Sequence, residues 1–148
     1  MPLLNLLLNL LWLFTGGLWM ALAWVIAGLF MAVTIIGLPW TFAAFRNARY
    51  TLLPFGYRVV DRALYEGRES LVTGPLGVIG NIIWLIFGAW WIVILHLLHA
   101  FLLAISIIGI PFAWAHLKLA GLALWPIGRV IVPIETAERM RYSAWRRV

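Results

Sequence analysis

Two long stretches of the chain carry no formally charged side chain, and they constrain the fold more than any other feature. The first covers residues 1–45 and the second covers residues 70–117. Each is longer than the ~20 apolar residues that cross a bilayer once. Because lipid offers the backbone no hydrogen-bond partners, such stretches must be folded into helices. The sequence therefore predicts an all-α integral membrane protein.

The composition supports this prediction. Hydrophobic types make up 65% of the 148 residues and charged types 11%, against about half and about a quarter in soluble domains. The absence of cysteine excludes disulfides, thiolate catalysis and cysteine-ligated metals. No Gly-rich phosphate loop, Ser/His/Asp set or carboxylate pair is visible in the sequence. We therefore expect no enzymatic activity, no cofactor and no resident metal ion.

The charged residues fall into zones that follow the two apolar stretches. The net charge is +6, and the segments 57–74 and 129–148 are both rich in arginine. The positive-inside rule places both segments, and with them both chain termini, in the cytoplasm. Membrane orientation accounts for the basic excess, so no nucleic-acid partner is expected.

The chain is internally duplicated at an offset of 72 residues. Residues 9–60 align with residues 81–132 without a gap, and 16 of the 52 positions are identical. Asn9, Trp12 and the Gly37-Leu38-Pro39 turn recur as Asn81, Trp84 and Gly109-Ile110-Pro111. Because both following segments are placed on one side, each copy must enter the membrane and return. This predicts two tandem parallel repeats.

Each repeat is expected to contain the same three helices. A short interfacial or re-entrant helix (about 3–15 and 77–87) precedes a crossing helix (about 18–36 and 89–108), and a Gly-x-Pro turn leads to a return helix (about 40–53 and 112–125). The predicted organisation is repeat 1 (1–60), a cytoplasmic linker (61–74), repeat 2 (75–132) and a basic tail helix (133–148). The β-branched residues of 57–74 suggest a short hairpin that turns near Glu66-Gly67.

Basic residues in or beside the return helices are candidate contacts for anions. A charge at the bilayer centre costs about 2.5–3.5 kcal/mol on insertion scales, so these side chains need a polar destination. They either snorkel to the headgroups or line a vestibule that favours anions or lipid phosphates; a structural ion pair is a third reading. The candidates are Arg46, Arg49, Lys118 and Arg129.

Polar residues inside the apolar stretches are the other candidates: Asn9, Asn81, His96, His99, Thr34 and Ser106. The two asparagines are expected to form hydrogen bonds between the copies, and the two hydroxyls to bond to carbonyls one turn back. The i,i+3 histidines could present imidazoles to a metal or a proton path, although packing is the simpler interpretation. His116 is expected at the membrane interface.

Small residues recur at four-residue spacing, as in Ala23 and Ala27 or Ala100 and Ala104. Such rows let helices approach closely, and so short a chain has few internal partners, so a homo-oligomer is predicted. A channel-like passage for ions or small solutes is the leading functional hypothesis. The alternatives are a non-catalytic scaffold that docks a larger membrane partner protein, or a protein that binds anionic lipids of the bilayer.

Several motifs resemble those of the YccF family of small bacterial inner-membrane proteins. They are Ser-Ile-Ile-Gly-Ile-Pro (106–111), Leu-Ala-Leu-Trp-Pro-Ile-Gly-Arg (122–129), Glu-Thr-Ala (135–137) and Asn-Ile-Ile-Trp-Leu-Ile-Phe-Gly-Ala-Trp-Trp (81–91). The likeness covers essentially the whole chain, including its doubled organisation. It implies a location in the bacterial inner (cell) membrane. The family has no defined catalytic residues, so it implies none here.

Overall fold

The computed structural model describes residues 2–34, 37–70 and 73–145, so the Ile35-Ile36 part of the first turn and the last three residues of the predicted tail lie outside the described residues. The first repeat contains α1 (Pro2–Trp12), a wide π-helical turn η1 (Leu13–Gly17), α2 (Leu18–Val33), α3 (Leu38–Leu52) and β1 (Tyr57–Asp61). The second contains α5 (Pro75–Trp84), η2 (Leu85–Ala89), α6 (Trp90–Ala104), α7 (Ile110–Leu124) and β2 (Arg129–Pro133). Two further helices follow the strands: α4 (Arg62–Glu66) and α8 (Ile134–Trp145). The mostly helical, doubled organisation predicted from the sequence is confirmed.

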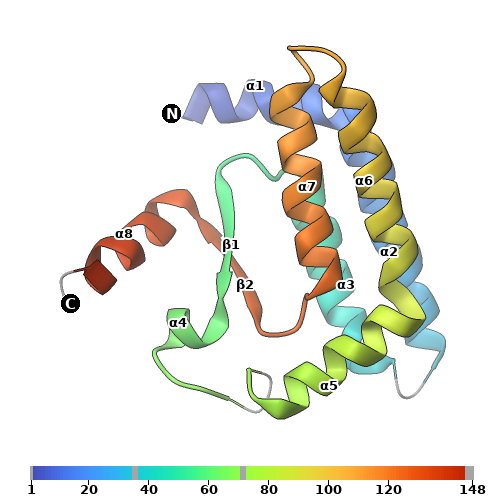
Figure 1. The fold of residues 1–148 in the computed structure, drawn as a ribbon, viewed down its shortest axis with the longest axis vertical. Coiled ribbons are helices and arrows are strands. Elements are labelled where there is room, and N and C mark those ends of the chain that lie inside the picture. The colour runs from blue at the N-terminus through green and yellow to red at the C-terminus, as the bar shows by residue number, and fades with distance from the viewer. Residues whose placement is uncertain (1, 35–36, 71–72, 146–148) are drawn as a thin grey trace.

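The glycines of the first repeat mark the points where its helices break. Gly16 in η1 has φ +135°, a backbone conformation that side-chain-bearing residues rarely adopt. It allows α1 to turn sharply away from α2 (Figure 1). At the other end of α2, the Thr34 hydroxyl accepts a hydrogen bond from the Gly37 N–H at 3.0 Å. The Ser106 hydroxyl accepts the equivalent bond from Gly109 at 2.9 Å.

Small residues let the helices of each repeat pack closely as a hairpin. Ala23, Ala27 and Ala100 are all buried in the single chain. A side chain at Gly28 would press on Phe45 and Ala44 of the returning helix α3. Ala104 is exposed, so the chain itself covers these rows only in part, and the homo-oligomer stays a prediction.

The strands β1 and β2 form an antiparallel two-stranded ribbon with Val59 opposite Ile131. These residues are 72 positions apart, which is the repeat offset, so an approximate twofold axis passes between them. The ribbon is closed by two equivalent bonds, from Arg62 N–H to Gly128 C=O at 2.8 Å and from Ile134 N–H to Gly56 C=O at 3.1 Å. The ribbon joins the two copies to each other.

The same axis relates the helices. Gly16, at the beginning of the α2 arm, lies against His99 near the end of α6, whereas Gly88 at the beginning of α6 lies against Met31 near the end of α2. The helices α2 and α6 therefore run in opposite directions, and α1 and α5 lie at opposite ends of the molecule (Figure 1).

The predicted parallel repeats, in which both copies enter the membrane from the same side, stay a prediction, because a twofold axis along the membrane normal relates parallel repeats and one in the membrane plane relates inverted repeats. The fold is mostly α, as predicted, with one two-stranded ribbon of β1 and β2 in addition. The hairpin predicted within 57–74 is wrong, since β1 finds its partner in the other repeat and residues 62–66 form α4.

The outer surface of the helices is apolar. Large side chains such as Phe14 (87% exposed), Phe101 (69%) and Ile105 (75%) face outward, as expected of a surface in contact with lipid. By length and composition, the segment Leu3–Val33 could cross a bilayer. The pair Pro75–Gly88 and Trp90–Ala104, bent by 73°, would be a second such segment, and the apolar helix Ile110–Leu124 is shorter.

Candidate functional site

A repeated brace of hydrogen bonds holds each strand to its own short helix. The Asn9 side chain donates to Phe55 C=O at 2.9 Å and accepts from Phe55 N–H at 3.0 Å. Asn81 makes the same two bonds with Ile127, at 3.1 and 2.9 Å. The bonds lie within each copy, so the expectation that the asparagines join the copies is wrong. Their amides satisfy the backbone where the Pro-x-Gly turn leaves the return helix.

Two buried tryptophans complete the brace. The indole N–H of Trp12 donates to Thr51 C=O, and that of Trp84 donates to Ala123 C=O at 2.8 Å. Both carbonyls lie in the last turn of a return helix, where backbone acceptors lack helical partners. The hydroxyls of Thr34 and Ser106 donate to carbonyls three residues back, Met31 and Leu103. These polar groups are accounted for by the fold.

A hollow of about 560 Å³ opens between α7 and the ribbon, and we call it the Lys118 pocket. Lys118, Arg58 and Arg129 line it, and no carboxylate is among its lining residues. The ammonium of Lys118 lies over the ring of Trp114 at 5.6 Å, within range of a cation–π contact. The other lining residues are Tyr50, Tyr57, Val59, Gly121, Leu122, Trp114 and Ile134. The pocket therefore offers an anion several positive groups beside an aromatic wall.

The twofold axis produces a second basic hollow of about 310 Å³, the Arg46 pocket. Arg46 is the repeat equivalent of Lys118, and it lines this pocket together with Arg62 and Arg129. Its cations are more engaged: Arg62 pairs with Glu66 at 3.3 Å, and Arg46 donates to Pro126 C=O at 3.5 Å. Arg129, which lines both pockets, lies 3.7 Å from Asp61. The Lys118 pocket holds the less compensated charge.

The structure thus gathers three of the four predicted basic residues around the ribbon, at two related pockets. Arg49 is exposed on α3 and lines neither pocket. Sequence reasoning missed Arg58, which lies in the ribbon, and Tyr50, which lies on the buried side of α3. Only the pairing of β1 with β2 brings Arg58 to the return helix of the other copy, so no local pattern could have found it.

The three histidines form a cluster where the Gly16 break of the first copy meets α6 and α7. The Nδ1 atoms of His96 and His116 are 3.0 Å apart, and both side chains are fully buried. His99 stacks on His116 with ring centroids 5.1 Å apart, and its Nδ1 lies 2.8 Å from Leu95 C=O. His116 was expected at the interface; this is wrong, because α1 and η1 of the other copy cover it.

The cluster belongs to one copy alone. The repeat equivalents of His96, His99 and His116 are Trp24, Ala27 and Ala44. The first copy therefore has one indole ring and two methyl groups at the positions where the second copy has three imidazoles. Within residues 2–34, 37–70 and 73–145, no group of three His, Cys, Asp or Glu side chains is arranged to hold a metal ion.

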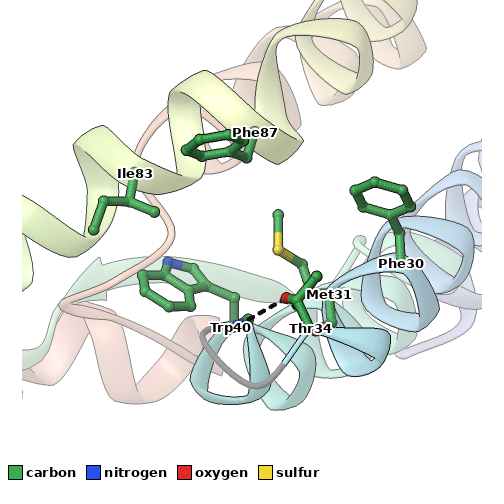
Figure 2. Close-up of a pocket in the computed structure, with 7 residues that line it drawn as sticks. Phe30, Met31, Thr34, Trp40, Ile83 and Phe87 are labelled. Atoms are coloured by element: carbon green, nitrogen blue, oxygen red, sulfur yellow. Dashed lines mark hydrogen bonds between the residues drawn. The ribbon is translucent and has the colours of Figure 1, made fainter.

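An apolar pocket of about 180 Å³ lies at the other end of the interface between the copies (Figure 2). Side chains of α2 and α3 face Ile83 and Phe87 across it. The indole N–H of Trp40, which lines the pocket, donates to Gly80 C=O at 3.1 Å. The side chains that line the pocket include no charged group. They come from both copies and contact one another through apolar surfaces, and they offer no reactive group.

Comparison with known proteins identifies the same duplication. The family model YccF, described as an inner membrane component domain, matches residues 7–57 and again residues 79–129. The protein named inner membrane protein YccF of Escherichia coli (strain K12) is 39% identical over 143 residues, which is 95% of each chain. The protein of that name from Shigella flexneri matches to the same extent. No solved structure matches this chain.

Proposed function

Because the chain belongs to the YccF family of inner-membrane proteins, we propose that it is a multi-pass, non-catalytic protein that binds the phosphate groups of anionic lipids in the Lys118 pocket. The observation that carries the proposal is the charge of that pocket, which is lined by three cationic side chains and no carboxylate. Basic pockets between membrane helices on the cytoplasmic side are typical sites for acidic lipid headgroups.

The surroundings of the pocket favour a lipid over a soluble anion. Trp114 is 59% exposed on α7 and Leu117 is 44% exposed, so an apolar helix surface continues outward from the Lys118 side of the pocket. On its other side lies the charged ribbon. A molecule with a phosphate group and acyl chains would satisfy both surfaces at once, and the indole and phenol rings are suited to this border.

Binding is tested by native mass spectrometry of the purified protein with phosphatidylglycerol or phosphatidylcholine. A double variant, Arg58→Gln with Lys118→Gln, should weaken phosphatidylglycerol binding by about tenfold or more, because each charge-assisted contact contributes about 1.5–3 kcal/mol. The control combines Arg49→Gln with Arg68→Gln, which removes the same two charges from exposed residues outside the pockets. Equal retention of the two lipids by the wild type, or unchanged binding in the double variant, would refute the proposal.

A further arm distinguishes the lipid from a free anion. Inorganic phosphate should compete only weakly, because it lacks the acyl chains that would lie along α7. If it displaces phosphatidylglycerol at equal concentration, the pocket is a site for soluble anions. The channel-like and scaffold roles remain predictions.

A further inference from the structure

The pair of histidines His96 and His116 is built asymmetrically. Their Nδ1 atoms are 3.0 Å apart, which is a hydrogen-bond distance. A neutral imidazole has one N–H and one bare nitrogen, so one Nδ1 must carry the proton and the other must accept it. It follows that the donor ring has a bare Nε2, whereas the acceptor ring carries its proton on Nε2.

The outer nitrogens of the pair, Nε2 of His96 and Nε2 of His116, are buried and make no hydrogen bond of standard geometry to the described residues. The backbone of Thr15 in η1 interacts with the His116 ring. A buried polar atom in this state destabilises the fold unless something else satisfies it. Water is the usual partner at such places. The pair therefore has one donor and one acceptor available to water molecules at its two ends.

The helices around the pair carry no acidic side chain that could take the shared proton from the two imidazoles. From the first copy, Trp12 approaches His116 with ring centroids 4.5 Å apart, and Gly16 leaves no space beside Nε2 for a side chain. The sequences of α1, α3, α6 and α7 contain no Asp or Glu. The other ionisable groups on these elements are His99, which stacks on His116, Lys118, which faces the basic pocket, and Arg46, Arg49 and Tyr50 on α3.

We propose that His96 and His116 form a proton-exchange pair inside the membrane. A proton from water bonds to the bare Nε2 of the donor ring, and the Nδ1–H bond of that ring breaks as its proton passes to Nδ1 of the acceptor ring. The acceptor ring then releases its Nε2 proton to water. One proton enters, one leaves, and both rings exchange tautomers. The starting tautomers of the two rings are restored when both rings flip or when the proton passes back.

His99 lies beside the pair on its partly exposed side. It is half-buried, and a carbonyl can only accept, so its Nδ1 donates to Leu95 C=O. Its ring stacks on His116, so a partly exposed imidazole lies directly next to the buried pair. The first copy has no counterpart, since Trp24, Ala27 and Ala44 occupy the equivalent positions.

The first measurement is nuclear magnetic resonance of protein labelled with ¹⁵N-histidine in bilayers. At neutral pH, one ring of the pair should be protonated at Nδ1 and the other at Nε2, with a ¹⁵N–¹⁵N coupling across the Nδ1–H···Nδ1 bond. The coupling should vanish in His116→Gln. A wild-type protein that shows no such coupling, or has the same tautomer in both rings, would overturn the proposal.

The second measurement is proton entry into vesicles that contain the protein and a trapped pH-sensitive dye, driven by a potassium gradient with valinomycin. The wild type should acidify the vesicles faster than protein-free lipid, and His96→Gln or His116→Gln should reduce the rate to that of protein-free lipid. Asn47→Leu is the matched control, because it replaces another buried polar group by its repeat equivalent, Leu119. A wild type no faster than lipid alone, or glutamine variants as fast as wild type, would also overturn it.

Discussion

Val59 and Ile131 face each other at the centre of the ribbon, and each is the repeat equivalent of the other. An antiparallel pair centred on equivalent residues can be formed only about a twofold axis. The same axis places His99 beside Gly16 and Met31 beside Gly88. A single relationship between two β-branched side chains thus fixes how the two copies are arranged.

The register of the ribbon can be tested by cross-linking, because the natural chain contains no cysteine. Val60→Cys with Val130→Cys should form a disulfide readily on mild oxidation, since these residues are directly opposite. Val60→Cys with Val132→Cys should react poorly, since antiparallel pairing separates them along the ribbon. Gel mobility before and after reduction reports the result. Preferential cross-linking of the second pair would indicate parallel strands.

The Gly16 break should not tolerate a side chain. In Gly16→Ala the alanine would have to adopt the positive φ of Gly16, and its Cβ would lie 3.0 Å from His116 Nε2. We therefore expect a loss of about 1–3 kcal/mol of stability. Gly121→Ala is the control, because nothing lies within 4 Å of its Cβ position on helix α7, and it should be neutral or stabilising. Thermal unfolding in detergent compares the two. Equal effects would contradict the observed conformation of Gly16.

The tryptophan brace should contribute to stability through its hydrogen bond. Trp84→Phe keeps a ring in place but removes the donor to Ala123 C=O, leaving a buried carbonyl unsatisfied at a cost of about 1–3 kcal/mol. Trp19→Phe is the matched control, since Trp19 is 66% exposed on the apolar surface. Denaturant titration in micelles should show the loss in the first variant alone. An unchanged midpoint for Trp84→Phe would mean that the bond is not formed.

Both polar segments beside the ribbon should be accessible from one side of the membrane. Single cysteines at Arg68 and Glu138, which are exposed residues, should react with a membrane-impermeant maleimide in inverted inner-membrane vesicles and stay unlabelled in intact spheroplasts. This follows from the positive-inside rule and from the pairing of β1 with β2. Labelling of the two sites from opposite sides would exclude a ribbon that lies at the cytoplasmic face.

Much of the helical pattern could be predicted from local sequence. The Gly-x-Pro turns, the Gly16 break and the lengths of the apolar segments gave helix limits close to those observed, because these residues act on the backbone within one turn of their own position. The basic residues Arg46 and Lys118 could also be selected as candidates, since few cations lie in apolar surroundings. These features depend on nearest neighbours in the chain.

Contacts between the copies could not be predicted in the same way. Charge counting placed the two basic segments on one side but did not reveal that they pair as antiparallel strands. The partner of Asn9 lies 46 residues away within the same copy, whereas His116 meets Trp12 of the other copy. Neither distance in sequence nor residue type distinguishes these cases, because both are decided by packing.

The sequence by itself determined the environment of this protein, its duplication and the positions of its helix breaks. These follow from the free energy of placing each side chain in lipid or water and from the backbone limits of glycine and proline. The tertiary structure alone decided that the copies are related by a twofold axis, that Arg58 and Lys118 share one pocket, and that two histidines share one hydrogen bond. Those outcomes depend on which surfaces fit together once the helices exist. Shape complementarity across the axis involves residues of both copies, so no single segment determines it.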